Sequence, residues 1–180
     1  MGREKLSIEV GGLPLIEHVK NALSSSCKEV LVVGGGVQLE GVRRVPDERP
    51  GRQGPLAGIE AGLAAADCPD AFVAAGDMPF LSRGLVAYLL ERLGKGDIVA
   101  VIPRYGGRSH PLCGAYARAL LPGVKGALDD GMRSVHEFLE GTDGVEYVGE
   151  ELRRFGDPEL LLMNVNSPRD LELARREAGL

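Results

Sequence analysis

The stretch that decides the fold is AFVAAGDMP, residues 71–79. Its first part, 71–75, is continuously apolar, which is typical of a strand that is buried on both faces of a parallel sheet. The GDMP that follows ends the strand and redirects the chain, so that Asp77 stands at the carboxyl end of the strand. Ligands of open α/β sheets bind beyond that end, and a carboxylate fixed there is well placed to hold Mg²⁺ beside phosphates. An aspartate that only forms the turn or caps a helix is the alternative interpretation.

On both sides of that stretch, the chain alternates short apolar runs with helical patterns. This alternation predicts an α/β fold with a mostly parallel sheet covered by helices on both faces. At this length we expect one domain, residues 1–180. The predicted strands are 30–33, 71–75, 97–102, 111–117 and 161–165, and the predicted helices are 13–23, 56–66, 85–93, 118–128, 134–139 and 168–177.

Composition excludes several classes of protein. The formal net charge of −5 provides no basic excess to bind nucleic acid, and no apolar stretch approaches the roughly 18–20 residues that span a bilayer. No secretory signal follows Met1. Cys27, Cys68 and Cys113 lack the C-x-x-C spacing of zinc or redox sites, so we interpret them as thiols of a reducing compartment. We expect a cytoplasmic protein that binds neither nucleic acid nor a membrane.

Further candidate residues lie at loops and at the amino end. Asp47 ends a short apolar segment, and glycines and the start of a helix near Pro55 follow it, a combination that suits a bound anion. A solvated polar loop is the alternative for Asp47. Lys5 could contact phosphates or be an ordinary solvated lysine. His110, before Pro111, could orient a substrate or form a turn.

Several short motifs together resemble those of molybdenum cofactor guanylyltransferases, in the same order along the chain. The resemblance covers nearly the whole sequence, and GPLAGI and GDMPF are fairly specific within the wider nucleotidyltransferase superfamily. It implies a single Rossmann-like, three-layer nucleotidyltransferase domain. The motifs are MGxxK (1–5), VGGxPL (10–15), GPLAGI (54–59), GDMPF (76–80), HPL (110–112) and NVNSP (164–168).

The resemblance also implies a reaction: transfer of GMP from GTP to the phosphate of molybdopterin, with release of pyrophosphate and Mg²⁺ as cofactor. Asp77 matches the Mg²⁺-binding catalytic aspartate, Lys5 the catalytic lysine on the nucleotide phosphates, and Asp47 an aspartate that contacts the guanine nucleotide. The attacking phosphate oxygen is already ionised, so catalysis needs positioning and charge neutralisation rather than a general base. Transient contact with molybdoenzymes or their chaperones is a further expectation. Contacts to the acceptor substrate are assigned to His110, Asn164 and Asn166.

The chain departs from the family pattern at its amino end. An apolar strand and a glycine-rich loop normally precede Met-Gly-x-x-Lys, whereas this sequence begins at that Met. We therefore expect the first central strand and the triphosphate loop to be missing, the native protein to extend upstream, and the 180-residue chain to turn over GTP weakly or not at all. Glycines after Val33, where a polar nucleotide contact is common in the family, leave base selectivity open. The alternatives are a sister nucleotidyltransferase that uses CTP or a sugar phosphate, and a non-catalytic protein that binds the cofactor.

Overall fold

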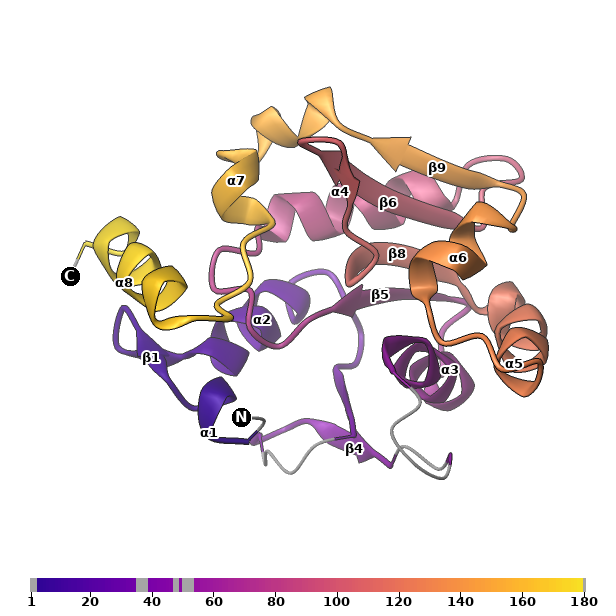
Figure 1. Cartoon of the computed structure of the whole chain (residues 1–180), viewed down its shortest axis with the longest axis horizontal. Helices are drawn as coiled ribbons and strands as arrows, with labels where there is room; N and C mark the ends of the chain where they lie inside the picture. Colours follow the sequence, from indigo (N-terminus) through magenta and orange to yellow (C-terminus); the bar gives the residue numbers. More distant parts are fainter. Residues whose placement is uncertain (1–2, 35–38, 47–48, 50–53, 180) are drawn as a thin grey trace.

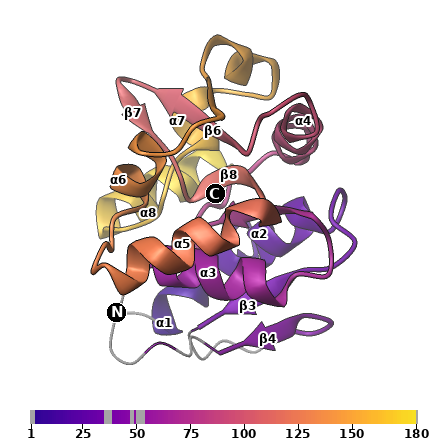
Figure 2. The same ribbon diagram turned by 90° about the vertical axis from the view of Figure 1, so that its right-hand side faces the viewer.

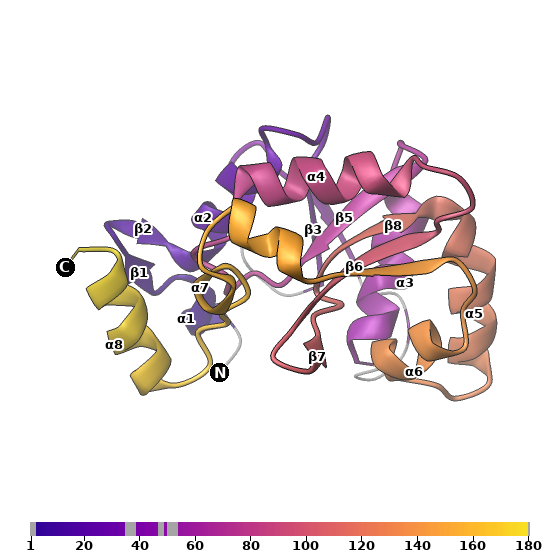
Figure 3. The same cartoon turned by 90° about the horizontal axis from the view of Figure 1, so that it is seen from above.

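The computed structural model describes residues 3–34, 39–46, 49 and 54–179, and shows three layers (Figure 1). Helices α2 and α4 cover one face of a central sheet, and α3, α5 and α6 cover the other face (Figure 3). The helices are α1 Arg3–Leu6, α2 Leu15–Leu23, α3 Pro55–Ala65, α4 Arg83–Leu93, α5 Leu121–Asp129, α6 Val135–Glu140, α7 Pro158–Leu161 and α8 Pro168–Glu177, with 3-10 turns at Arg118–Leu120 and Glu150–Arg154. The strands are β1 Glu9–Val10, β2 Leu13–Pro14, β3 Leu31–Val33, β4 Arg43–Val45, β5 Asp70–Ala74, β6 Ala100–Tyr105, β7 Arg108–Ser109, β8 Cys113–Ala117 and β9 Val145–Val148.

The central sheet has the strand order β5–β8–β6, with β7 and β9 also paired to β6. Strand β8 runs antiparallel to both of its neighbours, whereas β6 and β9 are parallel. The α/β fold class is confirmed, but the sheet is less parallel than the apolar runs predicted. The reason is the short connection from β6 through β7 to β8, which returns the chain directly, whereas a parallel strand needs a long crossover. The turn from β6 to β7 uses Gly106 and Gly107, both at positive φ, as in a two-residue hairpin loop.

Apolar side chains leave the sheet on both faces in alternation. In β6, Val101 joins the cluster beneath α2 and α4, while Ala100 and Ile102 join the cluster beneath α3, α5 and α6. All three residues are fully buried. Helices α3 and α5 pack side by side on that second face (Figure 2). The continuous apolar composition of the strand is therefore explained by helices on both sides, as predicted.

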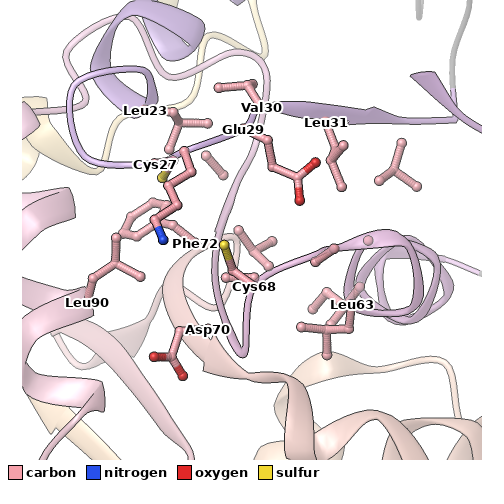
Figure 4. Close-up of a pocket in the computed structure, with 18 of the residues that line it drawn as sticks. Leu23, Cys27, Glu29, Val30, Leu31, Leu63, Cys68, Asp70, Phe72 and Leu90 are labelled. Carbon is pink, nitrogen blue, oxygen red and sulfur yellow. The ribbon is translucent and has the colours of Figure 1, made fainter. Parts of the chain in front are cut away.

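An apolar cavity of about 570 Å³ separates the central sheet from the β3–β4 pair. Figure 4 shows side chains that line it, among them Leu31 from β3, Leu63 from α3 and Phe72 from β5. Within the described ranges, β3 pairs only with β4 and β5 only with β8. The cavity corrects the prediction that β3 and β5 are buried strands, because residues beside it remain partly exposed.

The elements near the carboxyl end differ from the prediction in two places: one expected strand is absent, and one strand was missed. The strand expected over 161–165 is the end of α7 followed by an irregular segment. Pro158 at the first helical position and the Asp157 side chain, which accepts from the Glu159 amide, start a helix there. Strand β9 was not predicted.

None of the helices in the described ranges combines the length and the apolar character that crossing a membrane requires.

The connection into β9 provides a test of the fold. Gly144 has a φ of +77°, and a Cβ there would lie 2.5 Å from the Asp97 carbonyl oxygen, whereas Gly131 has a φ of +92° with no atom within 4 Å of an added Cβ. We expect Gly144→Ala to lower the free energy of unfolding by roughly 3 kcal/mol, from left-handed strain plus overpacking. The matched Gly131→Ala should cost only about 1 kcal/mol, from strain alone. Urea denaturation checks both, and equal losses would contradict the packing shown.

Candidate active site

The amino end of the chain reaches the end of β5 through a close contact at Gly76. A Cβ on Gly76 would lie 3.2 Å from Leu6 Cδ2, tighter than most side-chain contacts, so the absence of a side chain lets α1 pack against this loop. Lys5 precedes Leu6 on the same short helix. The glycine of the GDMP motif thus brings Lys5 to Asp77.

Lys5 makes two side-chain hydrogen bonds that join distant segments. Its Nζ donates to Asp77 Oδ2 at 2.5 Å and to Asn166 Oδ1 at 2.7 Å. The side chains of Lys5 and Asp77 are only 17% and 13% exposed, so water screens their attraction less than it would at the surface. Lys5 is therefore held in place by two partners, and the interpretation of an ordinary solvated lysine is wrong.

The segment that carries Asn166 is itself anchored at both ends. The Val165 amide donates to the Asp77 carbonyl oxygen at 3.0 Å, which joins this segment to the loop after β5. Helix α8 then begins with a capping box: Ser167 Oγ accepts from the Asp170 amide, and Asp170 Oδ2 accepts from the amides of Ser167 and Asn166. The hydrogen bond from the Asn166 amide, followed by those with Ser167, holds the pKa of the Asp170 carboxyl below its usual value. The asparagine is thus positioned by the helix start.

A cavity of about 500 Å³ opens at this place. Its lining includes Asp77, His110, Asn164 and Asn166, and Lys5 contacts two of them. The structure therefore brings together every site residue that the sequence singled out within the described ranges. Asp47 lies outside those ranges. The catalytic, nucleotide-binding and substrate-binding roles assigned to these residues stay predictions.

His110 lies on the loop before β8, at the edge of the cavity. Its amide donates to the Pro103 carbonyl oxygen at 2.8 Å, and its own carbonyl oxygen accepts from the Cys113 amide at 3.0 Å. Burial first, and then the nearby charges of His136 and Arg108, lower the pKa of His110. The lowered pKa favours the neutral form of the ring, which can both donate and accept a hydrogen bond.

Sequence reasoning missed part of the lining of this cavity. The missed residues are Ser109, Arg133, Ser134 and His136, and Ser109 Oγ lies 3.0 Å from His136 Nδ1. The two partners are 27 positions apart in the chain, and no motif links them. The only sequence signal was the predicted helix start at Ser134, whose hydroxyl caps α6 by accepting from the Glu137 amide.

The oxygen atoms of the cavity are the ligands that Mg²⁺ prefers. Asp77 supplies a carboxylate, and Asn164 and Asn166 supply amide oxygens. No cluster of three or more His, Cys, Asp or Glu side chains suited to a metal occurs in the described part of the chain. Mg²⁺ needs only one or two carboxylates when substrate phosphates complete its shell, so this donor set fits it.

The three-layer α/β fold, with a carboxylate and a lysine at the end of a strand, agrees with the comparisons, which identify the chain as a nucleotidyltransferase. The family described as "MobA-like NTP transferase domain" matches residues 1–147, and the chain belongs to this family.

Curated relatives and a solved structure agree with this assignment. A "Probable molybdenum cofactor guanylyltransferase" of Pelotomaculum thermopropionicum is 37% identical over 97% of this chain and 85% of that protein. A "Molybdenum cofactor guanylyltransferase" of Rhizobium johnstonii is 32% identical over 98% of this chain and 86% of that protein. The crystal structure of molybdopterin-guanine dinucleotide biosynthesis protein A from Archaeoglobus fulgidus superposes with a TM-score of 0.83 at 28% identity, covering 98% of this chain and 91% of that one.

Replacing Asp77 separates its chemical role from its structural one. We expect Asp77→Asn to lower the rate of nucleotidyl transfer by about 100-fold, because a carboxylate that organises charge at the phosphates is lost. Asparagine keeps an oxygen that can accept from Lys5 Nζ, so we expect the melting temperature to change much less than the rate. Pyrophosphate release and circular dichroism measure the two effects.

Asp157→Asn is the matched control for this substitution. Asp157 caps α7 and does not line the cavity, and asparagine caps helices equally well. We expect unchanged transfer. Asp77→Asn with the parent rate would remove Asp77 from the reaction.

Proposed function

We propose that this nucleotidyltransferase transfers GMP from GTP to the phosphate of molybdopterin and releases pyrophosphate, with Mg²⁺ as cofactor. The observation that carries the proposal is the Lys5–Asp77–Asn166 contact beside a cavity of about 500 Å³. The names of the curated relatives supply the nucleotide and the cofactor pathway. Transient contact with molybdoenzymes or their chaperones and a cytoplasmic location complete the proposal.

The side chains of the site act on charge and position in this proposal. Lys5 places a positive charge, directed by Asn166 Oδ1, where the nucleotide phosphates bind. Asp77, with oxygens of Asn164 and Asn166 nearby, would hold Mg²⁺, which supplies neutralisation of the negative charge that develops on the phosphates. Asp47 is the proposed contact to the guanine nucleotide.

No residue has to remove a proton from the attacking group. A phosphate monoester is ionised at neutral pH, as its second pKa is near 6. The site then accelerates the reaction by aligning the acceptor oxygen with the α-phosphorus and by stabilising the charge in the transition state. Burial lowers the pKa of His110 and so makes its imidazole a weaker base, and we assign the ring a hydrogen bond to the acceptor.

Nucleotide selectivity tests the proposed function. The chain is incubated anaerobically with molybdopterin, Mg²⁺ and GTP, CTP or ATP in turn, and the dinucleotide product and pyrophosphate are quantified. We expect transfer from GTP to exceed that from the other nucleotides about tenfold or more, since selectivity is a ratio of rates and is read even when turnover is slow.

The controls of this experiment omit the acceptor or use Asp77→Asn. Both should abolish most of the pyrophosphate release. A preference for CTP would instead support the sister activity, and binding of molybdopterin without transfer from any nucleotide would leave a non-catalytic binding protein.

A further inference from the structure

Two sets of polar side chains line the cavity that contains Asp77. The first set, called here the first wall, is Asp77, Asn164 and Asn166. The second wall comes from two segments far apart in the chain: strand β7 and the loop after it supply Ser109 and His110, and the start of α6 supplies Arg133, Ser134 and His136. The first wall carries a carboxylate and amides, and the second carries basic and hydroxyl groups.

Ser109 and His136 form a defined pair on this second wall. Ser109 Oγ lies 3.0 Å from His136 Nδ1, so the hydroxyl fixes the orientation of the ring. A hydrogen bond at Nδ1 leaves Nε2 as the nitrogen that can donate to a ligand. His136 itself is exposed, and a ligand can therefore reach it.

Arg133 adds a permanent positive charge to this wall. Its NH1 nitrogen donates to the carbonyl oxygens of Leu128 and Met132, at 2.9 and 2.8 Å. A guanidinium carries five N–H donors, so a group anchored in this way retains others for a ligand. An anchored guanidinium is well suited to bind a phosphate, because less side-chain freedom is lost on binding.

The reaction proposed above requires charge compensation for both of its anionic substrates. It brings the phosphate of the acceptor against a triphosphate, and the two anions repel each other. Lys5 is bonded to Asp77 and Asn166, on the first wall. Of the described residues that line the cavity, the basic ones are Arg133, His110 and His136, all on the second wall. Arg133 supplies a permanent positive charge there, and the Ser109–His136 pair supplies an oriented ring that can donate a hydrogen bond to an anion.

We propose that Arg133 and the Ser109–His136 pair bind the phosphate of the acceptor substrate and present its oxygen to the nucleotide in the same cavity. This assignment rests on the proposed function and adds to it the residues that recognise a phosphate monoester. The ligand class is a pterin that carries a terminal phosphate.

Direct binding tests the assignment without requiring turnover. Molybdopterin and the same pterin without its phosphate are titrated anaerobically into the 180-residue chain, without nucleotide, and pterin fluorescence is recorded. We expect His136→Gln and Arg133→Gln each to weaken binding of molybdopterin about tenfold, and Ser109→Ala to weaken it about threefold, as for loss of hydrogen bonds to a charged group. Binding of the dephosphorylated pterin should change less than about twofold, because it lacks the group that these residues contact.

Lys125→Gln is the matched control, since it removes one exposed positive charge from α5 without altering the cavity lining. We expect it to bind both pterins as the parent does. Variants that bind molybdopterin like the parent, or that weaken both pterins equally, would overturn the phosphate assignment while the proposed function stands. Failure of the parent chain to bind molybdopterin would instead contradict the proposed function itself.

Discussion

The Lys5 amino group is the point on which the geometry of the site depends. It joins α1 to Asp77 and to Asn166, residues that are 72 and 161 positions away in the chain. An ion pair that is largely removed from water adds little net stability, because the loss of hydration of both charges offsets their attraction. Its importance is positional: it sets a cation, a carboxylate and an amide at one end of β5. The energy that keeps these segments together must come from apolar packing.

That packing joins the two ends of the chain. Val10 and Leu15, from the β1–β2 hairpin and the start of α2, are buried against Val165 and Ala174, which lie before and within α8. The β1–β2 hairpin and α8 consequently lie side by side (Figure 1). Gly76 lets α1 approach the loop after β5, and this contact together with the small cluster holds the amino-terminal segment beside the partners of Lys5.

Some residues of the site could be predicted from the sequence by a general rule, some only from the resemblance to a family, and some not at all. Asp77 was predicted from a general rule, since a polar residue directly after an apolar strand faces the ligand side of the sheet. Asn166 entered only through the resemblance to a family, because no local pattern marks it. The Ser109–His136 contact was missed because it depends on the β6–β7 hairpin folding back toward α6. That same short return makes β8 antiparallel, a direction that apolar composition does not encode.

The distribution of charge explains how an acidic protein can serve anionic substrates. The net charge of −5 offers no general attraction for phosphates, so any affinity has to arise locally. Lys5 and Arg133 are each held by hydrogen bonds to the protein; Arg133 lines the cavity, and Lys5 is bonded to two residues that line it. Positive charges that are fixed before a substrate arrives need little reorganisation as negative charge develops, which is the condition for efficient electrostatic catalysis. A negative net charge then limits non-specific binding of nucleic acids, and two fixed basic positions still suit a reaction between two phosphates.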